Sequence, residues 1–124
     1  MKAPFRLIAG ALVAIALTHC DPLYANRVLK EVPSPNKQYR ALLFERDCGA
    51  TTNFSTQISL LTSSQSLQGT GNVLIVDFSV SKPSEVQVEW VENRRLRIRY
   101  VGREVRVFRQ VHKLGAVAVV YDVR

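Results

Sequence analysis

Two neighbouring segments, residues 86–90 and 95–100, alternate apolar and polar side chains with a period of two. The apolar positions are Val86, Val88, Trp90, Leu96, Ile98 and Tyr100, and the positions between them hold Gln87, Glu89, Arg95, Arg97 and Arg99. This period predicts two β-strands that each bury one face and expose the other. A three-residue loop at 92–94 pairs Trp90 with Leu96, whereas a two-residue turn would place core residues opposite exposed ones. We therefore expect a hairpin in which Glu89 also lies opposite Arg97.

Strand signals continue through most of the chain beyond its N-terminal leader. Further strands are expected at 38–46, 54–61, 73–80, 103–111 and 116–123. The segment 54–61 alternates like a half-buried strand, the Ser-, Gly- and Gln-rich stretch 62–72 predicts a long loop, and the last two strands are expected to pair and to turn near 112–115. No run of eleven or more residues beyond the leader has a helical stripe. We therefore predict an all-β fold, either a small antiparallel sandwich or a strongly curled meander sheet of six to eight strands.

The first residues have the layout of an export signal. Lys2 and Arg6 precede an uncharged apolar run from Leu7 to Leu17. As a helix, this run would extend only about 16 Å, which is short of the roughly 30 Å hydrocarbon core of a bilayer. An uncleaved membrane anchor and a buried helix are the alternative interpretations.

The sequence LTHC at 17–20 resembles the lipobox of bacterial lipoproteins. That resemblance implies that Cys20 is diacylated, becomes the new N-terminus and anchors the protein in the membrane. His19 departs from the family pattern, which has a small residue at that position. In diderm members of the family, an acidic residue in the position of Asp21 implies retention at the inner membrane, facing the periplasm. A signal-peptidase cut after Ala25, which would remove Cys20, is the competing interpretation.

The resulting organisation is a signal peptide at 1–19, a tether at 20–35 that contains one short strand, and a single β domain at 36–124. The tether ends in Pro-Ser-Pro-Asn at 33–36, which is turn chemistry because each proline fixes φ and lacks an N–H. About 100 residues without the leader fit one small domain.

Cys48 lies in the motif RDCGATT at 46–52, which resembles a stretch of small exported bacterial proteins of unknown function. The resemblance implies no activity. A thiol nucleophile would need a neighbouring base, and His112 is the only histidine beyond the leader. Three other interpretations remain: a buried residue near a strand end, a free thiol, and a bridge to Cys20 if the leader is retained. We expect no catalytic residues, no cofactor and no metal, since one cysteine and one histidine cannot complete a zinc site.

Positive charge is concentrated toward the C-terminus. Residues 94–124 hold nine basic and two acidic side chains, whereas 21–93 hold six basic and eight acidic ones. The candidate binding residues are Arg95, Arg97, Arg99, Arg103 and Arg106. They could contact membrane headgroups or an acidic protein partner. The alternative is a solvated face whose arginines pair with Glu85, Glu89 and Glu92. An export signal argues against nucleic acid as the partner.

These features together predict an exported bacterial domain of the cell envelope, tethered to the membrane, that acts by binding or as a structural component. A periplasmic inhibitor or immunity-like protein is the alternative function. Its blocking element would be a protruding loop at 48–53 or 62–72.

Overall fold

The computed structural model describes residues 26–47, 55–77, 85–102 and 105–124, so Cys20, Cys48 and Arg103 lie outside the described residues. The described residues form nine strands and no helix. The strands are β1 (Asn26–Pro33), β2 (Tyr39–Arg46), β3 (Ser55–Thr62), β4 (Leu74–Val76), β5 (Val86–Glu92), β6 (Arg95–Tyr100), β7 (Val107–Gln110), β8 (Lys113–Leu114) and β9 (Val117–Val123). The predicted all-β fold is confirmed, with nine strands in the described residues where six to eight were expected.

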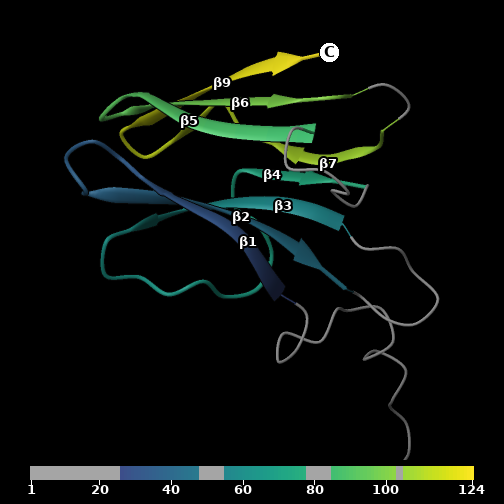
Figure 1. The fold of residues 1–124 in the computed structure, drawn as a ribbon, viewed down its shortest axis with the longest axis horizontal. Coiled ribbons are helices and arrows are strands. Elements are labelled where there is room, and N and C mark those ends of the chain that lie inside the picture. Colours follow the sequence, from purple (N-terminus) through teal and green to yellow (C-terminus); the bar gives the residue numbers. More distant parts are fainter. Residues whose placement is uncertain (1–25, 48–54, 78–84, 103–104) are drawn as a thin grey trace, which may run out of the picture.

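The strands form two sheets that pack face to face as a sandwich (Figure 1). Sheet A has the order β1-β2-β3-β4-β7 and is antiparallel throughout. Sheet B has the order β5-β6-β9-β8, in which β6 and β9 run parallel. The parallel pair arises because the chain leaves sheet B after β6, adds β7 to sheet A, and then returns to sheet B. The predicted sandwich is therefore confirmed, but it is not antiparallel in every pair.

Strand β1 lies within the stretch interpreted as a tether. It pairs with β2 along its length, from Asn26 opposite Arg46 to Pro33 opposite Arg40, with a bulge at Leu29. Residues 26–33 therefore form an edge strand of sheet A, longer than the short strand expected there. The predicted turn follows directly: the Lys37 amide donates to the Ser34 carbonyl at 2.9 Å.

The β5–β6 hairpin has the predicted register. Trp90 pairs with Leu96, and Glu89 pairs with Arg97. The turn contains only Asn93 and Arg94, so the predicted three-residue loop is wrong. A β-bulge at residue 91 supplies the odd residue instead, and it preserves the side-chain parity on which the register depends.

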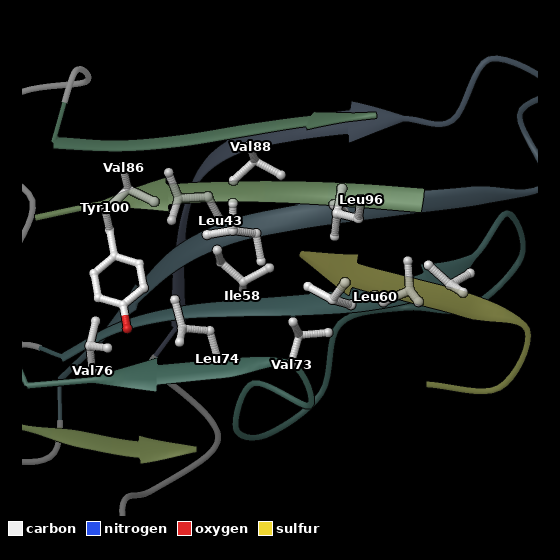
Figure 2. Close-up of a cluster of buried hydrophobic side chains, with 14 residues drawn as sticks. Leu43, Ile58, Leu60, Val73, Leu74, Val76, Val86, Val88, Leu96 and Tyr100 are labelled. Carbon is white, nitrogen blue, oxygen red and sulfur yellow. The ribbon is translucent and has the colours of Figure 1, made fainter. Parts of the chain in front are cut away.

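The hydrophobic core fills the space between the two sheets (Figure 2). Its buried members are Ala41, Leu43, Ile58, Leu60, Val73, Leu74, Val76, Val86, Val88, Leu96, Ile98, Tyr100, Val117 and Val119. Figure 2 shows Val76, Val86 and Tyr100 gathered at one end of this cluster, and Leu60, Val73 and Leu96 toward the other. Each buried aliphatic side chain contributes about 1.5–3 kcal/mol of transfer free energy, so this cluster is the main source of stability.

A loop covers the outer face of sheet A, and we call residues 63–73 the covering loop. Leu67 of this loop packs on a second apolar cluster formed by Leu42, Phe44 and Leu61. Gln57 of β3 accepts a hydrogen bond from the backbone amide of Gly71 in the covering loop, at 2.6 Å. The prediction that β3 is half-buried is therefore wrong: its polar side chains lie under the covering loop, and both of its faces are buried.

The predicted final pair of strands is also wrong. Strand β7 pairs with β4 in sheet A, whereas β9 pairs with β6 in sheet B. Between them, Val111 and Leu114 pack against the core, so the chain crosses from one layer to the other. A short β8–β9 hairpin then turns at Gly115, whose φ of 60° favours glycine. Alternation along a strand does not encode which sheet the strand joins, which is why the sequence pattern suggested a simple hairpin.

Candidate binding surface

Three of the predicted binding residues, Arg95, Arg97 and Arg99, lie on the face of β6 that points away from the core. The register of sheet B places residues of β5, β8 and β9 beside them on this surface. We call this surface the arginine face, and it comprises Gln87, Glu89, Arg95, Arg97, Arg99, Lys113, Ala118, Val120, Asp122 and Arg124. Its five basic and two acidic side chains give a net charge of +3.

Two carboxylates neutralise part of this charge. Glu89 of β5 bonds Arg97 across the hairpin, with its Oε1 atom 2.6 Å from Nε and 2.5 Å from Nη2. The same oxygen lies 3.9 Å from Nη2 of Arg99. On the other side of β6, Asp122 lies 3.3 Å from Nε of Arg99 and 3.6 Å from Nη2 of Arg124. The two carboxylates thus form a line of ion pairs across three strands.

These ion pairs are exposed to solvent. The side chains of Glu89 and Arg97 are 48% and 38% exposed, so the pair contributes about 0.2–1 kcal/mol and is screened by salt. Arg95 is exposed, and no carboxylate of the described residues forms an ion pair with it, although Glu92 lies opposite in the register. Pairing with glutamates is therefore confirmed for Glu89 and does not occur for Glu92 within the described part of the chain.

Arg106 lies apart from the β6 arginines. It precedes β7 in sheet A, and its guanidinium carbon lies 5.9 Å from the centroid of the Phe108 ring, a cation–π distance. The Phe108 side chain is 60% exposed. Arg103 lies outside the described residues. The structure therefore groups Arg95, Arg97 and Arg99 on one surface and places Arg106 on the other sheet.

Sequence reasoning missed Asp122, Arg124 and Lys113 as parts of this surface. They lie there because β9 pairs with β6 in parallel, and β8 pairs with the other edge of β9. The only sequence signal is the alternation of Ala118, Val120 and Asp122 with more buried positions. This alternation predicts a strand but does not identify the strand with which it pairs.

His112, the base that a thiol enzyme would need, is an exposed residue beside β8. Its ring contacts the edge of Tyr121, with centroids 5.2 Å apart. The Tyr121 hydroxyl donates to the carbonyl of Val111 at 2.7 Å. Burial, reinforced by the neighbouring Tyr100, raises the pKa of Tyr121 well above its usual value, so this hydroxyl is a structural donor at neutral pH. Cys48, the thiol that such an enzyme would need, lies outside the described residues.

A cleft of about 310 Å³ opens between the sheets, lined by groups such as Tyr39, Leu60, Gln65 and Leu114. None of its lining residues is charged. Within the described ranges, no group of three or more His, Cys, Asp or Glu side chains could hold a metal ion. The same ranges contain no helix that is long and apolar enough to cross a membrane.

Comparison of the chain with protein-family models, with curated proteins and with solved structures found no match.

Proposed function

We propose that this chain is an exported bacterial domain, held at the envelope membrane through acylated Cys20, that binds an acidic protein partner through the arginine face or holds a place in an envelope assembly by that contact. The support for the anchor comes from the leader and from the lipobox resemblance at 17–20.

The excess of positive charge on the arginine face carries the proposal. Its two carboxylates are already shared among Arg97, Arg99 and Arg124. Arg95 and Lys113 are exposed and have no ion pair with any described carboxylate. Two cations on the same surface are thus available to bind carboxylates of another molecule, and guanidinium groups favour bidentate contacts with carboxylates.

The shape of this surface favours a macromolecular partner over a small substrate. It is the outer side of sheet B. Most of its residues belong to β5, β6 and β9, and their side chains lie next to one another across these paired strands. Small-molecule sites are concave, whereas protein contacts spread over a broad surface with a polar rim. Val120, which is 39% exposed beside Arg97 in the register, adds an apolar contact at the middle of the surface.

Two measurements test the two halves of the proposal. The mass of the intact protein purified from its native membrane should equal that of a chain beginning at acylated Cys20. A mass that begins at Asn26 without lipid would contradict the anchor.

For the surface, binding of poly-glutamate, a model acidic chain, is measured against salt concentration. The double variant Arg95→Gln/Lys113→Gln should bind several-fold more weakly than the unmodified protein. The control Lys30→Gln/Lys37→Gln removes the same charge from exposed positions on sheet A and its first turn. Equal losses in both variants would show that binding follows net charge rather than the arginine face. Glu89→Gln should strengthen binding, because it releases Arg97 and Arg99 from their shared carboxylate.

A further inference from the structure

We propose that one end of the sandwich, the end at which β1 begins, lies against the phospholipid bilayer. This inference rests on the proposed anchor at Cys20. We call this end the proximal end and the opposite end the distal end. The proximal end holds the first residues of β1, β3, β5 and β7 and the last residues of β2, β4, β6 and β9. In Figure 1 the arrowheads of β4, β6 and β9 point toward it.

Covalent geometry limits how the tethered domain can be placed. Asn26, where β1 begins, is six residues after Cys20. Even fully extended, six residues span at most about 22 Å. The eight-residue strands of sheet A are about 26 Å long. If the distal end faced the bilayer, the start of β1 would lie farther from the surface than the link can reach. Only the proximal end or a side of the sandwich can therefore face the membrane.

Exposed apolar side chains distinguish among the remaining orientations. Most of the large hydrophobic side chains that the described residues expose lie in the proximal half, and these are Val28, Leu29, Val101, Val107, Phe108 and Val123. Of the two others, Val120 lies at the middle of β9 and Val91 lies in the distal half, at 46% against 51% for Val101. Side chains of this kind enter the boundary between headgroups and acyl chains at a gain proportional to the apolar area they bury.

Phe108 and Arg106 form a pair suited to that boundary. The exposed phenyl ring can enter the acyl region, while the guanidinium beside it reaches the lipid phosphates. The described side chains at these strand ends include five basic and five acidic ones, so net charge does not drive the contact; they are Arg27, Arg46, Arg99, Arg106 and Arg124 against Glu45, Asp47, Asp77, Glu85 and Asp122. The membrane contact should therefore depend weakly on salt, unlike binding at the arginine face.

The sides of the sandwich suit the bilayer less well. The outer face of sheet A lies under the covering loop, whose exposed residues Ser63, Ser64, Gln65, Ser66 and Gln68 are polar. The arginine face would have to remove water from its ion pairs, which is unfavourable. With the proximal end on the bilayer, the strands stand away from the membrane and the arginine face points sideways, where a partner can reach it.

The test uses the full chain, lipidated and purified from bacterial membranes, in vesicles of phosphatidylcholine and phosphatidylglycerol that contain nitroxide-labelled lipid. Cys48→Ser provides the background. Single fluorescent probes are attached at Val101→Cys and Val123→Cys for the proximal end and at Val91→Cys, a valine of similar exposure, for the distal end. We expect quenching by the nitroxide to be several-fold stronger at residues 101 and 123 than at 91, at both low and high salt.

The outcomes separate this inference from the proposed function. An acylated mass with equal quenching at all three positions, or with stronger quenching at 91, would overturn the orientation and leave the anchor intact. A mass without lipid would overturn the anchor, and the inference that rests on it would fall as well. Replacing Phe108 by Ser should reduce quenching at 101 and 123 while leaving the acylated mass unchanged, and unchanged quenching would argue against a role for the phenyl ring.

Discussion

The indole Nε1 of Trp90 donates a hydrogen bond to the backbone carbonyl of Val32, at 2.8 Å. Trp90 belongs to β5, the edge of sheet B, and Val32 belongs to β1, the edge of sheet A. The Trp90 ring also stacks on Tyr39 of β2, with centroids 6.3 Å apart and planes inclined by 22°. One side chain therefore joins the two sheets along the side where both have an edge strand.

Replacing Trp90 tests this link in two steps. Trp90→Phe keeps an aromatic ring and removes the donor, and it should lower the free energy of unfolding by about 1 kcal/mol. Trp90→Ala also removes the ring. Because Trp90 is only partly buried, its loss should exceed that of the Phe variant but stay below the roughly 3–5 kcal/mol typical of a buried aromatic residue. Urea denaturation followed by circular dichroism measures both, and an unchanged midpoint in both variants would contradict the link.

Asn72 extends the β3 ladder with its side chain. Its Oδ1 accepts from the amide of Leu60 at 2.8 Å, and its Nδ2 donates to the carbonyl of the same residue at 3.0 Å. Asn72→Asp replaces the donor by an acceptor that faces the carbonyl, so we expect a loss of about 1–3 kcal/mol. Asn36→Asp is the matched control. The Oδ1 atom of Asn36 accepts hydrogen bonds from the Ser34 hydroxyl and the Gln38 amide, and a carboxylate oxygen can accept the same two bonds. Equal losses in the two variants, measured by urea denaturation, would contradict the assigned role.

Gly71 lies where a side chain has no space. A Cβ atom there would lie 2.8 Å from the carbonyl oxygen of Ile58 and 2.9 Å from that of Leu74, and both are backbone atoms of paired strands. Gly71→Ala should therefore cost about 1–3 kcal/mol, as overpacking does. Thermal unfolding of Gly71→Ala should show a clear decrease in Tm, and an unchanged Tm would count against this explanation.

Buried Tyr100 and partly buried Tyr121 predict a loss of stability in alkali. Burial raises the pKa of Tyr121 and of Tyr100 above the usual value of 10.0. Above pH 10, the unfolded chain releases these protons while the native state keeps them. The unfolded state then binds fewer protons, so the free energy of unfolding is unaffected below pH 10 and falls as the pH rises beyond it. Tyr121→Phe should make this decline shallower, and unfolding in urea at a series of alkaline pH values measures the slope. A slope equal to that of the unmodified protein would contradict the prediction.

Period-two alternation was sufficient to predict the β5–β6 hairpin, because its register depends on residues that are close in the sequence. It was insufficient for β3. Ser55, Gln57 and Ser59 read as solvent-facing, yet Gln57 and Ser59 are each only 2% exposed. Their polar groups are satisfied by backbone amides of the covering loop, a contact that no local pattern encodes.

The candidate surface was predicted to a similar extent. Alternation placed Arg95, Arg97 and Arg99 on one face of β6, and the hairpin register gave the Glu89–Arg97 pair. The contribution of Asp122 depends on the parallel pairing of β6 with β9, which brings together residues from two segments separated by a whole strand of the other sheet. Val111 and Leu114 pack against the core where the chain crosses between the layers, and periodicity carries no information about which sheet a strand joins.

The alternation of the chain between layers also determines when each sheet can be finished during folding. Sheet A lacks its last strand until β7 has formed, which comes after two strands of sheet B, and sheet B is incomplete until β9 has paired with β6. Neither layer is therefore encoded by one continuous segment of the chain, and a single cut between strands cannot separate the two complete sheets. The additions of β7 and β9 are non-local pairings, which should make them slow steps of folding.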